Sequence, residues 1–140
     1  MPQKLPARWD DWLAFFASQL PEPVHREDHE DGSITYTAGD PGEVIVRLTP
    51  RVIHVAEFTA RQAEPVDRRP PPRWLGRVYW RRMRERLAIG AVEALVHAAR
   101  QGRRATYRRC ELCDRLCAPE RMVDPVTCRA CVDRSGTDER

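Results

Sequence analysis

The stretch Ile34–Phe58, ITYTAGDPGEVIVRLTPRVIHVAEF, decides the fold of this 140-residue chain. β-Branched residues dominate three short runs, and the segments DPG and TPR separate them. Proline and glycine between such runs favour turns. We therefore predict a three-stranded antiparallel meander with strands at 34–37, 44–48 and 52–58.

An amphipathic helix is predicted upstream, over Pro6–Leu20. Pro6 suits the first turn of a helix, and Pro21 and Pro23 end it. Large apolar residues recur at helical spacing on one side, as expected for a face that packs on a core. They are Trp9, Trp12, Leu13, Phe16 and Leu20.

The acidic segment Val24–Gly32 is predicted to be a solvated connector. His25 and His29 lie four residues apart, a spacing that can hold a metal ion on a helix. No third ligand is evident nearby, and two ligands are fewer than zinc sites require. We expect no metal site here.

The segment after the meander is predicted to be a linker, Thr59–Pro72, followed by a long helix. The helix is expected to run over Trp74–Gln101 and to end at Gly102, with Gly90 as a possible kink or break between two helices. From Leu87 to Ala99 the sequence is apolar almost all round, which predicts burial.

A strong positive charge accumulates over residues 73–109. This segment has eleven arginines against two acidic residues, Glu85 and Glu93, for a net charge of +9. On a helix, four of the arginines would fall within one arc. Four more continue the charge towards the C-terminus. Because guanidinium groups pair well with phosphate, we predict a nucleic-acid contact surface. The eight residues are Arg73, Arg77, Arg81, Arg84, Arg103, Arg104, Arg108 and Arg109.

Two Cys-x-x-Cys pairs, Cys110/Cys113 and Cys128/Cys131, give the strongest chemical signal in the sequence. Two residues between cysteines let a tight turn direct both sulfurs at one ion, and four thiolates complete a tetrahedral zinc site. Such a site has no open position, so we expect one structural zinc ion. The alternative is a disulfide framework, which needs an oxidising compartment. No secretory signal is visible in residues 1–12.

Cys117 is the fifth cysteine. It follows Cys113 by four residues, so a Cys113/Cys117 pair is an alternative to the symmetric arrangement. We expect Cys117 to be the spare thiol, either buried filler or a redox-sensitive group.

The sequence CELCDR, a short loop and PVTCRACVDR resembles the four-cysteine zinc ribbons and treble-clef fingers. The order of its motifs is also similar to the DksA/TraR-type finger of RNA-polymerase regulators. The resemblance covers about 22 residues. It implies a knuckle holding the first pair, a short helix opened by the second pair, and a module that contacts nucleic acid or protein.

These patterns together predict an α+β protein with an N-terminal helix, a three-stranded meander, a long basic helix or helix pair, and a zinc finger. The expected units are 1–69, 70–102 and 103–140. No linear catalytic motif or phosphate-binding glycine loop is found, so we expect no enzyme, although a nuclease without such motifs stays possible. Lys4 is the only lysine, so genomic base composition is an alternative cause of the arginine content.

Two functional classes fit the sequence. The first is a cytoplasmic, DNA-binding or RNA-binding regulator associated with transcription, from a bacterium or phage. The second is a protein-interaction module, such as an adaptor or an immunity-type inhibitor, whose arginines face an acidic partner such as a transcription component. No membrane segment or small-molecule substrate is evident.

Overall fold

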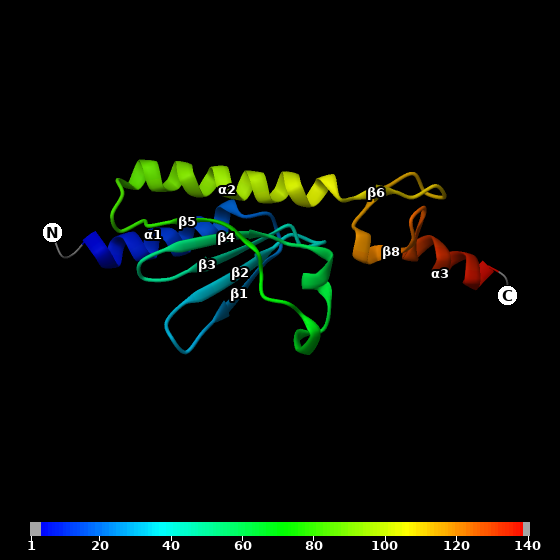
Figure 1. Cartoon of the computed structure of the whole chain (residues 1–140), viewed down its shortest axis with the longest axis horizontal. Coiled ribbons are helices and arrows are strands. Elements are labelled where there is room, and N and C mark those ends of the chain that lie inside the picture. Colours follow the sequence, from blue (N-terminus) through cyan, green and yellow to red (C-terminus); the bar gives the residue numbers. More distant parts are fainter. Residues whose placement is uncertain (1–3, 139–140) are drawn as a thin grey trace.

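The computed structural model describes residues 4–138 of the chain and the side chains of residues 9–135. A five-stranded antiparallel sheet is covered on one face by two helices, and a small module follows at the C-terminus (Figure 1). The elements in chain order are α1 (Lys4–Gln19), β1 (Val24–Asp28), β2 (Ile34–Ala38), β3 (Val44–Leu48), β4 (Ile53–Glu57), η1 (Ala60–Ala63), η2 (Val66–Arg68), β5 (Trp74–Val78), α2 (Glu85–Ala105), β6 (Arg108–Arg109), β7 (Leu116–Cys117), η3 (Pro119–Arg121), β8 (Met122–Asp124), β9 (Thr127–Cys128) and α3 (Arg129–Asp138).

Alternation along the strands separates a buried face of the sheet from a more open one. The strands follow one another in the order β1-β2-β3-β4-β5. Tyr36 pairs with Val46, and Val46 pairs with Val55, so one buried row crosses the three central strands. Burial of this face supplies most of the core, because side chains two residues apart point to the same side of a strand.

Both long helices pack on the same face. Trp12, Phe16 and Leu20 from the α1 side join Ala88, Val92 and Ala99 of α2 in one apolar cluster with the sheet. The predicted helix over Pro6–Leu20 and the three predicted central strands are therefore confirmed. The helix and the strands could be predicted because their apolar residues recur with the period of a helix or of a strand.

The predicted connector Val24–Gly32 is wrong, because Val24–Asp28 is strand β1. It pairs antiparallel with β2 over its whole length, Val24 opposite Ala38 and Asp28 opposite Ile34. Only Val24 is partly buried, so the strand has no alternating apolar pattern to reveal it. Charged side chains on an edge strand are expected, since they discourage pairing with a second sheet.

The predicted start of the long helix is also wrong. Residues 74–78 form the edge strand β5, and α2 begins only at Glu85. Gly76 explains the close packing here: a Cβ atom at this position would lie 2.8 Å from Cδ2 of Leu95 on α2. From Glu85 to Ala105 the helix continues through Gly90, so no break separates two helices. Its length of about 30 Å carries the chain to the C-terminal module (Figure 1).

Candidate metal centre

The four cysteines of the two Cys-x-x-Cys pairs meet in one cluster. Their sulfur atoms all lie within 4.8 Å of one another, with 3.7 Å between Cys110 and Cys131 and 3.9 Å between Cys113 and Cys128. Four sulfurs placed tetrahedrally about 2.3 Å from a zinc ion are about 3.8 Å apart. The cluster can therefore hold one metal ion, and zinc fits both its size and its thiolate ligands.

Short hairpins and one helix turn bring these ligands together. Cys110 and Cys113 lie in the turn between β6 and β7, where the amide of Asp114 donates a 2.8 Å hydrogen bond to the carbonyl of Cys110. Asp114 has a φ of 61°, a left-handed conformation that tight turns require and that aspartate tolerates better than most residues. Cys128 ends β9, and Cys131 lies in the first turn of α3.

The protein environment favours the thiolate form at two ligands; at Cys128, a hydrogen bond from the backbone amide of Cys131 lowers the pKa of the thiol. Backbone amides of Cys128 and Cys113 donate to the Cys110 sulfur, which lowers the pKa of that thiol to about 6. Burial raises the pKa of the Cys131 thiol to about 12, although Arg134 donates to its sulfur over 3.2 Å. A bound divalent cation would supply the positive charge that allows all four thiolates to coexist.

Cys117 lies close to this cluster but is not one of the four cysteines that meet. Its thiol faces the carbonyl of Arg115 over 3.6 Å, and burial and the neighbouring cysteines raise its pKa. The structure therefore brings together the cysteines of the two Cys-x-x-Cys pairs, and not a Cys113/Cys117 pair.

The C-terminal hairpins and helix, residues 108–138, are called the cysteine module below. Its apolar cluster consists of the five cysteines and Met122. A core of this size contributes little hydrophobic free energy, so metal binding would supply much of the module's stability.

Arg103 connects the cysteine module to the sheet. Its side chain is 1% exposed, donates from Nε to the carbonyl of Gly42 over 2.7 Å, and pairs with Glu120 of η3. Its guanidinium also lies over the rings of Phe58 and Tyr107, 5.2 Å from each centroid. Arg103 was one of the predicted phosphate contacts, but its side chain is buried and links α2 to the sheet and to η3. A ligand cannot reach it.

The side chains of Arg104 and Arg109 are exposed, but each forms hydrogen bonds within the protein. Arg104 donates to the largely buried carboxylate of Glu43 over 2.8 Å, and Arg100 pairs with the same carboxylate. Arg109 donates to the carbonyl of Asp114 over 2.6 Å. Arg108, next to it on β6, is exposed and has no ion pair among the described side chains.

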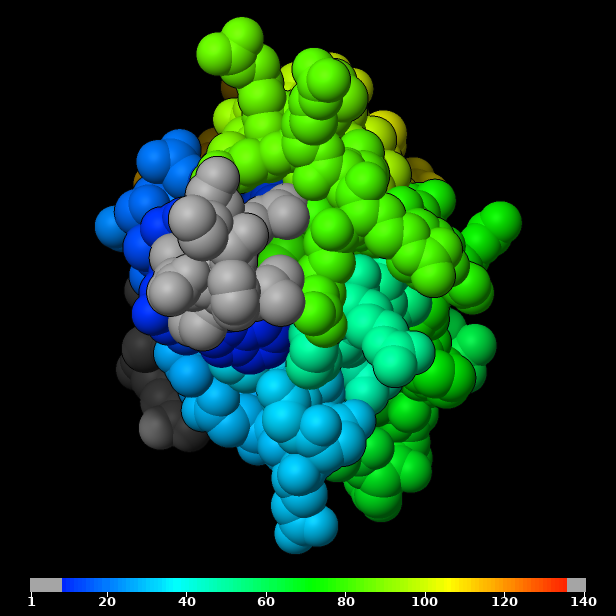
Figure 2. Space-filling model, turned by 90° about the vertical axis from the view of Figure 1, so that its left-hand side faces the viewer, coloured from blue at the N-terminus to red at the C-terminus, as the bar shows by residue number. Residues whose placement is uncertain are grey.

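The four arginines predicted to share one helical face do not do so. Arg77 lies on β5, Arg73 precedes that strand, and Arg81 and Arg84 lie in the connection to α2. This connection is at the end of α2 opposite the cysteine module (Figure 1). Figure 2 shows this end of the molecule, with side chains of the green segment projecting from it. The eight arginines are therefore not one continuous row.

A second set of arginines, which the sequence analysis did not single out, surrounds the cysteine cluster. A groove of about 660 Å³ is lined by three of the cysteines and by four arginines from the β6–β7 turn, η3 and α3. Among the described side chains, Arg115 and Arg129 have no ion pair, whereas Arg121 pairs with Asp40. Only folding of the module brings these positions together, because they are spread over 20 residues. They are Arg115, Arg121, Arg129 and Arg134.

Among the described side chains, His25 and His29 belong to no group of three or more potential ligands that lie close together. Both belong to the β1–β2 hairpin region, and the Nε2 atom of His29 lies 2.7 Å from the hydroxyl of Thr35. The cysteine cluster is the one candidate metal site found among the described residues.

Comparison with known proteins gives no match: neither a family model, nor a curated protein sequence, nor a solved structure resembles the chain. None of the helices described is both long and apolar enough to cross a membrane.

Proposed function

We propose that this chain is a zinc-stabilised protein that contacts nucleic acid through the cysteine module. The observation that carries the proposal is the groove beside the cysteine cluster, which four arginines line. Arginine pairs with phosphate through two parallel hydrogen bonds, and a row of such groups positions a protein on a nucleic-acid backbone.

The arrangement of the ligands supports a treble-clef interpretation of the module. One cysteine pair lies in a hairpin turn, and the other spans the end of β9 and the first turn of α3. A zinc ion bound by the four cysteines would hold these elements together without an open coordination position. The role of the metal is therefore to position the contact surface. Such a module suits a regulator of transcription, which is the role that we propose for this chain.

The contact surface differs from the one predicted from the sequence. Arg103 is buried, and Arg104 is held by Glu43, so neither is available. We propose Arg108, Arg115 and Arg129 as the phosphate contacts, because they are exposed and unpaired among the described side chains. Arg73, Arg77, Arg81 and Arg84 would reach nucleic acid only if it extended about 30 Å along α2.

Salt dependence of binding tests the proposal. Fluorescence anisotropy would measure the affinity of the zinc-loaded chain for a duplex and a single strand over a range of salt. The double variant Arg115→Gln/Arg129→Gln should flatten the logarithmic duplex salt slope by about 2, since each lost phosphate contact removes about 0.9. The matched control, Arg61→Gln/Arg68→Gln, changes two exposed arginines outside the module and should keep the wild-type slope. Lack of binding to either oligonucleotide at ~50 mM salt would refute the proposal, because phosphate contacts are strongest at low salt.

A second candidate function, binding of a protein partner, is favoured by the apolar surface of the same module. Five large apolar side chains are exposed on it, which is unusual for so small a unit. If neither oligonucleotide binds, and a protein that copurifies with the wild type is lost from Leu112→Ser/Leu116→Ser, this candidate replaces the first. The exposed residues are Leu112, Leu116, Val123, Val126 and Val132.

A further inference from the structure

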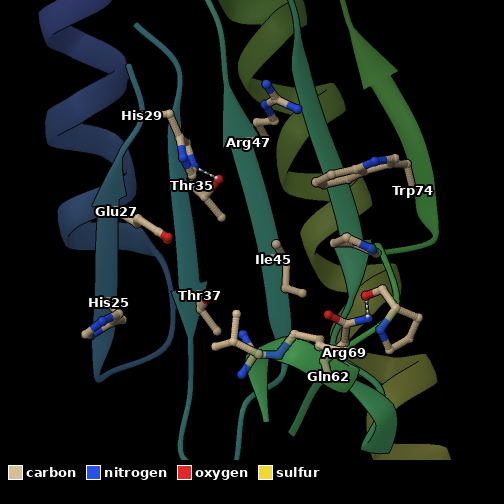
Figure 3. Close-up of a pocket in the computed structure, with 13 residues that line it drawn as sticks. His25, Glu27, His29, Thr35, Thr37, Ile45, Arg47, Gln62, Arg69 and Trp74 are labelled. Carbon is tan, nitrogen blue, oxygen red and sulfur yellow. Dashed lines mark hydrogen bonds between the residues drawn. The ribbon is translucent and has the colours of Figure 1, made fainter. Parts of the chain in front are cut away.

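The face of the sheet turned away from α1 and α2 contains a groove of about 590 Å³. Its floor is the outward row of β1, β2 and β3, and the segment between β4 and β5 closes one side (Figure 3). Pairing places Thr35 opposite Arg47 and Thr37 opposite Ile45, so these four side chains share the face. Gln62, which lines the groove, lies on η1, and η1 contacts η3 of the cysteine module, whereas the strands of the floor, β1 and β2, lie at the lower edge of the molecule in Figure 1.

The two ends of the groove are basic, and the middle is apolar. Figure 3 shows Arg47 and His29 at one end, Arg69 reaching toward Thr37 at the other, and Ile45 between them. Arg47 and Ile45 are two residues apart on one strand, so roughly 7 Å of strand separates the Arg47 end from the apolar middle. Among the residues that the structure describes, Glu27 is the one carboxylate that lines the groove.

Trp74 forms one wall. Its ring packs against His54 with a centroid separation of 5.4 Å and is only partly buried. A tryptophan fixed by a neighbouring ring and still partly exposed provides a flat surface on which a planar group can stack. The other three tryptophans belong to the apolar cluster under the helices.

The arginines at both ends keep donors for a ligand. Arg69 uses Nε and Nη2 on the carbonyl of Glu64, which fixes its position and leaves Nη1. Arg47 donates from Nη2 to Asp31 and to the hydroxyl of Ser33. The Nε of Arg47 is buried and out of reach of a ligand, so Nη1 is the donor that Arg47 keeps. A preorganised guanidinium loses less entropy on binding phosphate than a free one.

We propose that this groove binds a nucleotide, with the base stacked on Trp74 and the phosphate held by Arg69. The hydroxyl of Thr37 is placed to donate to the same phosphate, because Arg69 reaches toward it. Arg47 offers a second phosphate position at the far end, as a single strand requires. A nucleotide joins a phosphate to a planar ring. The groove offers arginines for the phosphate, and an aromatic wall and a short apolar floor for the ring.

Among the described residues, none lines both this groove and the groove of the cysteine module, so the two proposals can fail separately. Binding would be followed by ¹H–¹⁵N spectra of the full zinc-loaded chain, with the indole signal of Trp74 assigned by its loss in Trp74→Leu. The probes are adenosine 5′-monophosphate, ribose 5-phosphate and an eight-residue oligoadenylate. Stacking tolerates every base, so adenine serves as a representative.

The nucleotide should shift the indole signal of Trp74, and ribose 5-phosphate should bind more weakly. Trp74→Leu and Arg69→Gln should each weaken nucleotide binding about tenfold, as expected for one stacked base or one charged contact. The matched controls Tyr79→Leu and Arg68→Gln change an exposed aromatic ring and an adjacent arginine outside the groove, and should bind as the wild type does. Arg115→Gln/Arg129→Gln should also leave nucleotide binding unchanged.

Tighter binding of the oligoadenylate than of the mononucleotide would identify a single strand as the source of the nucleotide. Binding of the mononucleotide alone would identify a free nucleotide. The proposal is overturned if neither the mononucleotide nor the oligoadenylate moves the Trp74 signal at millimolar concentration. It is also overturned if Trp74→Leu and Arg69→Gln both bind the nucleotide like the wild type, or if ribose 5-phosphate binds as well as the nucleotide.

Discussion

Arg103 shows how far the environment of a single residue can depart from its sequence context. It stands in the most basic segment of the chain, yet it is buried between Gly42, Glu120 and two aromatic rings. The neighbouring Arg104 is exposed and bonds to Glu43 from outside. The adjacent arginines therefore have opposite roles, one structural and internal, the other at the surface.

Replacing these two arginines should have very different effects on stability. Arg103→Met leaves the carboxylate of Glu120 and the carbonyl of Gly42 without their donor, and should lower the free energy of unfolding by about 3–5 kcal/mol. Arg104→Met removes an exposed partner and should cost about 1 kcal/mol or less. Urea unfolding of the zinc-loaded variants would measure both. Equal losses of unfolding free energy in the two variants would contradict the structural role of Arg103.

At the same scale, the meeting of the four cysteines could be predicted from the sequence, and the surroundings of the arginines could not. Cys-x-x-Cys spacing is local, because the turn that it encodes lies within four residues. The exposure of an arginine depends instead on partners far along the chain, such as Glu43 for Arg104. Arg115 and Arg129 carried no signal because they become neighbours only when the module folds.

At the scale of elements, the strands with apolar alternation could be predicted and the two edge strands could not. β1 is polar after Val24, and β5 has a run of only five residues, WLGRV. The arginine spacing around β5 also suits a helix, so pattern alone favoured the wrong element. Pairing with β4 decides it, since Val78 lies opposite Ile53 and Arg77 opposite His54.

The continuity of α2 can be tested at Gly90. This glycine is exposed within the helix, and a Cβ atom added to it meets nothing within 4 Å. Gly90→Ala should therefore raise the free energy of unfolding by about 0.5–1 kcal/mol, the difference in helix propensity. Thermal unfolding followed by circular dichroism would measure the change. A destabilised variant would indicate a break in the helix at this position.

At the scale of the whole molecule, α2 separates two regions that the sequence analysis treated as one basic surface. One end of the helix carries the arginines of the β5–α2 connection, and the other leads into the cysteine module (Figure 1). The sheet groove adds a third location on the opposite face from both helices. Segment charge summed along the sequence could not distinguish these sites, because a helix about 30 Å long lies between two of them.

The most direct test of this account is the zinc content of the chain, measured by native mass spectrometry for the wild type, Cys128→Ser and Cys117→Ser. The four sulfurs that meet include Cys128 and exclude Cys117. We predict one zinc ion per chain in the wild type and in Cys117→Ser, and none in Cys128→Ser. In Cys128→Ser the amide signals of residues 108–138 should also collapse to unfolded positions while those of the sheet persist. A full complement of zinc in Cys128→Ser, or its loss in Cys117→Ser, would contradict the four-cysteine centre.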